Sequence, residues 1–128
     1  MKKTIIILTA LVMLAGLLVN TGCKKKDKFD ITGVWYFTIT LLGEDFDETY
    51  TFVGDNRGGE VLWDGQSLGT YSAGDGYVDF TLEYIDQDGD YTVEVYRGSF
   101  DSGDVISGNL TITIEGYESV DGTWFAVR

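Results

Sequence analysis

The fold is decided by residues 33–42, which read Gly33-Val34-Trp35-Tyr36-Phe37-Thr38-Ile39-Thr40-Leu41-Leu42. The bulky apolar side chains stand at alternate positions from Trp35 to Leu41, and mostly polar or smaller residues stand between them. Successive side chains of a β-strand point to opposite faces, so this pattern predicts a strand with one bulky apolar face. Such a face needs a curved or stacked sheet to cover it.

Turn signals recur about every eight to twelve residues after this strand, which is typical of an all-β domain. Asp64-Gly65 matches a two-residue hairpin turn. No segment keeps a helical period, and no gap is long enough for a crossover helix, so the pairing is expected to be antiparallel. Further strands are predicted over residues 46–53, 60–63, 66–73, 77–85, 90–100, 104–115 and 122–128.

Eight strands in a row have exposed edges unless the first strand pairs with the last. The sequence therefore predicts an all-β fold, an antiparallel up-and-down β-barrel of about eight strands. The alternative is a sandwich of two separate sheets. An eight-stranded barrel has an interior that side chains can just fill, or that can hold one small ligand.

The N-terminus has the pattern of an export signal. A basic start, Met1-Lys2-Lys3, precedes an apolar run from Ile5 to Val19. This run is shorter than the roughly 20 residues that a membrane-spanning helix needs, so we interpret residues 1–22 as a signal peptide. An uncleaved anchor helix is the alternative.

Cys23 follows this run directly and is the only cysteine, which excludes an intramolecular disulfide. Thr21-Gly22-Cys23 resembles the lipobox of bacterial lipoproteins. The resemblance implies that Cys23 carries acyl chains such as palmitate, which would anchor the protein to a membrane of the bacterial cell envelope, the outer membrane or cell surface. Residues 23–29 would then form a basic tether, which is either simply solvated or lies near anionic head groups. The domain proper would span residues 30–128.

The domain is strongly acidic. From Asp30 onward the chain has 20 Asp and Glu residues and three arginines, which gives a formal charge of −17. Such a field repels phosphate backbones and argues against a nucleic-acid partner. A cationic protein partner would suit it.

Gly33-Val34-Trp35 at the start of the first strand resembles the Gly-x-Trp signature of lipocalins and the wider calycin group. The likeness covers roughly residues 31–128. It implies that Trp35 closes one end of the barrel and that Arg128, just beyond the last strand, packs across it. It also favours the binding of a small apolar molecule in the barrel mouth.

The sequence offers little for catalysis. There is no histidine, and the only thiol is expected to be acylated, so Ser–His and Cys–His pairs are excluded. Strand alternation places Asp79, Glu83 and Glu94 on the outer face, so that no inward position of a regular strand would carry an acid. We therefore expect no enzyme activity and no cofactor.

Asp86-Gln87-Asp88-Gly89-Asp90 resembles the start of a calcium loop, with Asp86, Asp88 and Asp90 as the weak candidates for ligands. Tyr91, however, occupies the position where an EF-hand needs glycine. We interpret the segment as a hairpin turn with solvated carboxylates, and predict no metal site. Weak calcium binding is the alternative.

The aromatic residues leave two functions open. Most of them are expected to form the core, whereas Trp63, Tyr71 and Tyr84 lie nearer strand ends and are the candidates for a ligand site at a barrel mouth. One function is the binding of a small apolar molecule there. The other is a structural or protein-interaction role, with a filled barrel and an acidic exterior.

Overall fold

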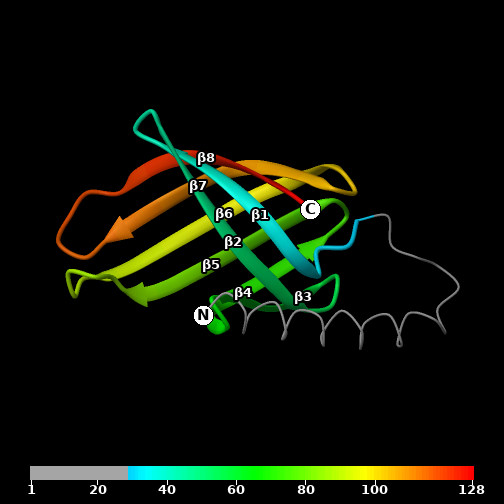
Figure 1. The fold of residues 1–128 in the computed structure, drawn as a ribbon, viewed down its shortest axis with the longest axis horizontal. Helices are drawn as coiled ribbons and strands as arrows, with labels where there is room; N and C mark the ends of the chain where they lie inside the picture. Colours follow the sequence, from blue (N-terminus) through cyan, green and yellow to red (C-terminus); the bar gives the residue numbers. More distant parts are fainter. Residues whose placement is uncertain (1–28) are drawn as a thin grey trace, which may run out of the picture.

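The computed structural model describes residues 29–128, which form a closed barrel of eight antiparallel strands (Figure 1). Each strand pairs with the next in sequence, and β1 pairs with β8. The predicted all-β, up-and-down barrel is thus confirmed. The strands are β1 (Gly33–Leu41), β2 (Glu44–Gly54), β3 (Gly58–Trp63), β4 (Gln66–Gly74), β5 (Tyr77–Ile85), β6 (Tyr91–Ser102), β7 (Val105–Ile114) and β8 (Val120–Val127).

The pairing of the first and last strands closes the sheet. Residues of β1 and β8 lie opposite each other from Tyr36↔Val127 to Leu41↔Gly122. Because of this pairing, the first and last strands have no exposed edge, as they would have in an open sheet of eight strands. It also rules out the sandwich, which would need two separate sheets.

Aromatic side chains fill the middle of the barrel. The face of β1 that carries Trp35, Phe37 and Ile39 points inward, and all three side chains are buried. Phe37 stacks on Trp124 with ring centroids 5.0 Å apart, and Phe80 stacks on Tyr96 at 4.2 Å. Gly98 makes room for Trp124, because a Cβ atom there would lie 2.5 Å from the indole ring. The middle of the interior is therefore a packed core.

The two ends of the barrel are defined by the direction of the strands. The closed end comprises the start of β1, the β2–β3, β4–β5 and β6–β7 turns, and Arg128. The open end comprises the β1–β2, β3–β4, β5–β6 and β7–β8 turns. In Figure 1 the β5–β6 and β7–β8 turns of the open end extend to the left, and the C-terminus lies toward the right.

Two sequence hypotheses fall outside this part of the chain. The signal peptide and Cys23 lie before residue 29, outside the described residues, and so does the tether as far as Lys28. Within residues 29–128, no helix has the length and apolar character needed to cross a membrane.

Candidate functional site

Trp35 and Arg128 seal the closed end. The Trp35 side chain is completely buried, and its Nε1–H donates a hydrogen bond to the Ile31 carbonyl at 2.7 Å. The Arg128 guanidinium carbon lies 4.4 Å from the centroid of the Trp35 ring, within the range of a cation–π contact. The structure thus brings together the pair that the calycin resemblance implied.

Arg128 is held in place by several partners at this end. Its guanidinium donates to the Thr32 carbonyl at 3.0 Å and to the Gly103 carbonyl at 3.2 Å. Its Nε lies 3.6 Å from a carboxylate oxygen of Asp104. One side chain therefore ties together the start of β1, the β6–β7 turn and the end of the chain.

The open end has a cavity of about 470 Å³ instead of such a seal. It forms where β4 and β5 stop pairing with each other: their pairing runs only from Gly69↔Leu82 toward the closed end, so residues 66–68 of β4 and 83–85 of β5 do not pair with each other. An irregularity between Val61 and Leu62 in the β3–β4 register lies at the same corner. The cavity is lined by Glu48, Tyr50, Trp63, Gln66, Ser67, Leu68, Leu82, Glu83, Tyr84, Ile85 and Glu94.

The size of this cavity suits a small molecule. Ligand pockets in proteins have volumes of about 300–1,000 Å³. The open-end cavity lies within this range, and its floor is made by residues that belong to the packed core, Tyr50 and Leu82. The barrel is therefore filled in its middle and has a hollow toward the open end.

Glu94 lies inside the barrel, contrary to the sequence-based expectation. Only 8 % of it is exposed, and its side chain lines the cavity. The Tyr84 hydroxyl donates to one carboxylate oxygen, and the Tyr96 hydroxyl donates to the other at 2.5 Å. The expectation that no inward position carries an acid was wrong, because β6 has moderately apolar residues on both faces and its alternation alone does not distinguish them.

The register of the β5–β6 hairpin is the signal that could have placed Glu94. Directly opposite residues of an antiparallel pair project to the same face of the sheet. Leu82 lies opposite Glu94, and Phe80 lies opposite Tyr96. The alternation of β5 marks Phe80 and Leu82 as inward, so the register carries Glu94 inward with them.

The tyrosines around Glu94 form a chain of hydroxyl groups. The Tyr50 hydroxyl oxygen lies 3.4 Å from that of Tyr96. Because the single proton of Tyr96 is used for Glu94, Tyr50 can act as the donor in this contact. Burial raises the pKa of Tyr50 and of Tyr96 well above the ordinary value, and the nearby Glu94 adds to the rise. These phenols therefore stay neutral donors over the physiological pH range.

Trp63 and Tyr84, two of the three residues expected at a barrel mouth, both line the open-end cavity. Trp63 keeps 40 % of its surface exposed, and its indole N–H donates to a carboxylate oxygen of Glu48 at 3.2 Å. Burial is the largest cause of the raised pKa of Tyr84, and its hydrogen bond to Glu94 raises this pKa further. The two aromatic rings and the two glutamates together form the wall of the cavity.

Tyr71 is not part of this mouth. Its side chain is buried in the core, and its hydroxyl donates to the Asp55 carbonyl at 2.6 Å, in the β2–β3 turn of the closed end. The expectation that it shares a mouth with Trp63 and Tyr84 was therefore wrong. Strand β4 runs from the open end to the closed end, so a residue late in this strand lies far from the cavity.

The charge around the cavity is wholly negative. Glu48, Glu83 and Glu94 line it, and no lysine or arginine does. Of the three arginines in residues 29–128, Arg57 lies in the β2–β3 turn and Arg128 at the closed end, while Arg97 lies exposed in β6 opposite Asp79.

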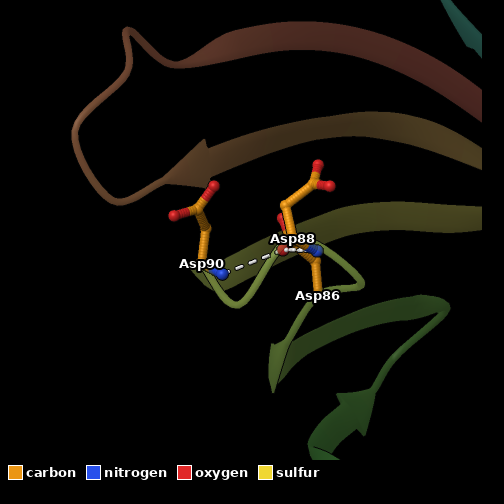
Figure 2. Close-up of side chains that lie close together, drawn as sticks. All are labelled: Asp86, Asp88 and Asp90. Carbon is orange, nitrogen blue, oxygen red and sulfur yellow. Dashed lines mark hydrogen bonds between the residues drawn. The ribbon is translucent and has the colours of Figure 1, made fainter.

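The three aspartates of the β5–β6 turn lie close together (Figure 2). The Asp86 carboxylate accepts hydrogen bonds from the backbone N–H groups of Asp88 and Asp90, each at 2.9 Å. Figure 2 shows the carboxylates of Asp90 (left) and Asp88 (right) both above these bonds. Because Asp86 already satisfies the backbone of its own turn, the arrangement supports the interpretation as a hairpin turn.

Comparison with known proteins gives no relative for this chain. No protein-family model matches it, and neither a curated protein nor a solved structure does.

Proposed function

We propose that the protein is an envelope-anchored lipoprotein whose lipocalin-like barrel binds a small molecule at its open end. The observation that carries the proposal is the asymmetry of the barrel. One end is sealed by Trp35 and Arg128, and the other has a cavity of about 470 Å³. An eight-stranded barrel with this asymmetry is suited to take a ligand from one side only.

The direction of the barrel agrees with an anchor at Cys23. The described chain begins at the closed end, where the Phe29 ring packs on Phe100 with centroids 5.0 Å apart. Cys23 precedes Phe29 by six residues, which span at most about 20 Å even when fully extended. A lipid at Cys23 would therefore keep the closed end near the membrane and turn the cavity away from it.

The alternative is a structural or interaction domain without a ligand. The packed aromatic middle of the barrel favours it, because a filled interior leaves the acidic exterior to meet a cationic partner. The open-end cavity favours binding over this alternative. The two functions differ in whether a small molecule accompanies the protein in its own envelope.

Native mass spectrometry of the full-length protein, purified from its own envelope, tests the proposal. We expect a bound small molecule in addition to the acyl chains on Cys23. The molecule should be lost in Gln66→Trp, because Gln66 lines the cavity and faces the same side as its cross-strand partner Trp63. Gln87→Trp is the matched control, since Gln87 is exposed in the β5–β6 turn. Wild-type protein that carries no small molecule would contradict the proposal and favour the interaction domain.

A further inference from the structure

We infer that the ligand of the open-end cavity is an organic cation, an amine or quaternary ammonium group joined to an apolar portion. This inference rests on the proposed function and narrows it. It replaces the wholly apolar ligand that the calycin resemblance implied, because three glutamates line the cavity and a wholly apolar ligand brings no positive charge to offset them.

The first argument is the charge of the lining. Glu48, Glu83 and Glu94 line one cavity, and no lysine or arginine lines it. Glu94 accepts a hydrogen bond at each of its two oxygens, from the Tyr84 and Tyr96 hydroxyl groups. A cation would gain from this field, whereas an anion would be repelled by it.

The second argument is the aromatic wall. Tyr50, Trp63 and Tyr84 line the same cavity as the carboxyl groups. The hydrogen bond from the Trp63 indole N–H to Glu48, at 3.2 Å, holds a large aromatic ring beside an acid. Aromatic faces attract ammonium groups, and tryptophan does so most strongly. An aromatic wall next to acidic side chains therefore binds a primary or alkylated ammonium group better than an uncharged group of similar size.

The third argument separates an organic cation from a metal ion. A metal ion needs ligand oxygens that converge on one point. Within residues 29–128, the one group of three carboxylates that lie within 4.8 Å of one another is that of Asp86, Asp88 and Asp90, outside the cavity. The glutamates of the cavity are spread more widely and already accept hydrogen bonds from Trp63, Tyr84, Tyr91 or Tyr96. Separated carboxylates suit a bulky cation whose charge is spread over several carbon atoms.

The apolar part of the ligand has its own contacts. Leu68, Leu82 and Ile85 line the cavity beside the acids. Leu82 is fully buried, whereas Ile85 is exposed at the end of β5. The lining thus offers apolar contacts from the core to the rim, which is where the apolar portion of an amphipathic cation would lie.

Three water-soluble probes with one ring and different charges test the inference: benzyltrimethylammonium, phenylmethanesulfonate and benzyl alcohol. Each is titrated by calorimetry into the full-length protein in a neutral maltoside detergent with 0.15 M NaCl, a concentration at which the screening length is about 8 Å. We expect the cation to bind about tenfold or more tightly than either of the other two. Gln66→Trp should abolish this binding, and Gln87→Trp should not.

Neutralising single acids separates the cavity from the general negative charge of the domain. Glu48→Gln should weaken the binding of benzyltrimethylammonium by about five- to tenfold, since it removes the acid beside Trp63. Asp47→Asn is the matched control, because it removes the same charge one residue away, where Asp47 is exposed and accepts from Thr38 on the outer face. Asp47→Asn should leave the affinity within about twofold.

The outcomes distinguish this inference from the proposed function. Benzyl alcohol or phenylmethanesulfonate could bind as tightly as benzyltrimethylammonium or more tightly, and lose this binding in Gln66→Trp. That result would overturn the inference that the ligand is a cation, but it would still support a small-molecule site in the cavity. Equal weakening by Glu48→Gln and Asp47→Asn would show attraction to the acidic surface and would also overturn the inference. No binding of any probe, together with no molecule carried from the envelope, would overturn both.

Discussion

The two ends of this barrel are built from the same strands but differ in what fills them. At the closed end, a buried tryptophan lies under an arginine that reaches two carbonyl groups and a carboxylate. At the open end, a half-exposed tryptophan lies beside a glutamate, and the space between the strands is hollow. The same type of residue therefore serves packing at one end and lines a cavity at the other.

The difference shows how a small barrel can combine stability with a site. The packed aromatic middle and the sealed end keep most large side chains away from water. The open end carries the features that cost stability, including a buried glutamate, the ends of β4 and β5 that do not pair with each other, and concentrated negative charge. Such features concentrate where a protein binds a ligand, because a site needs polar groups that a core would exclude.

The largest difference between the ends should appear when each tryptophan is removed. Trp35→Ala should lower the free energy of unfolding by about 3–5 kcal/mol, because it empties a fully buried position and removes the partner of Arg128. Trp63→Ala should lower it by less than about 1 kcal/mol, because Trp63 lies at the rim. Urea unfolding of both variants measures the effect, and equal losses would contradict the contrast.

Alkaline pH should destabilise the floor of the cavity. Folding raises the pKa of Tyr50 and of Tyr96, mainly through burial, so above about pH 10 the folded state retains protons that the unfolded chain loses. The stabilisation is therefore complete below pH 10 and is lost as the pH rises further, by about 1.4 kcal/mol per pH unit for each tyrosine.

Urea unfolding at a series of pH values measures this loss. The double variant Tyr50→Phe/Tyr96→Phe should have a flatter profile above pH 10 than the wild type. A wild-type profile as flat as that of the double variant would show that the two phenols ionise without cost in the folded barrel.

Two pairs of glutamate and tyrosine allow a matched test of the buried acid. Glu94→Leu should cost about 2–3 kcal/mol, because it leaves the buried hydroxyl of Tyr96 without its acceptor. Adding Tyr96→Phe should recover part of this loss. Glu83→Leu, which breaks the exposed pair with Tyr91, should change stability by less than about 0.5 kcal/mol. Thermal unfolding compares the variants, and a neutral Glu94→Leu would show that the network contributes nothing to folding.

Removing the arginine of the seal should have a smaller effect. Arg128→Ala should cost about 1 kcal/mol, since it removes the contact with Trp35 and the bonds to two carbonyl groups at a partly exposed position. Arg57→Ala, in an exposed turn of the same end, is the control and should lie within about 0.5 kcal/mol of the wild type. Equal effects of the two substitutions would mean that Arg128 does not seal the barrel.

The smallest effect is expected from salt. The 20 carboxylate residues and three arginines from Asp30 onward repel one another on balance, and NaCl screens this repulsion. The urea midpoint should rise by on the order of a few tenths molar between 0.05 and 0.5 M NaCl. A midpoint that falls with salt would show that favourable ion pairs outweigh the repulsion.

Most of the fold could be predicted because it depends on local signals. The alternation in residues 33–42 and the turns rich in glycine and aspartate mark strands whose bounds agree with the structure to within a few residues. The closure of β1 on β8 follows from the need to protect sheet edges. None of these inferences requires information about which side chains contact each other across the barrel.

The candidate site depends on contacts between side chains of different strands, so less of it could be predicted from the sequence. Trp63 and Tyr84 lie at the ends of β3 and β5, two strands that run in the same direction, and they meet at one mouth. Tyr71 lies late in β4, which runs the other way, so nearness to a strand end placed it at the wrong end of the barrel. Glu94 was missed because its face is set by its neighbours on β5, not by its own strand.

The most direct test is to map where a small cation binds, by NMR of the ¹⁵N-labelled full-length protein titrated with benzyltrimethylammonium. The account predicts that the amide signals of Glu48, Trp63 and Tyr84 shift, together with the indole N–H signal of Trp63, while those of Trp35 and Arg128 stay in place. Shifts at Trp35 and Arg128, or shifts spread evenly over the acidic surface, would contradict the division of the barrel into a sealed end and a binding end.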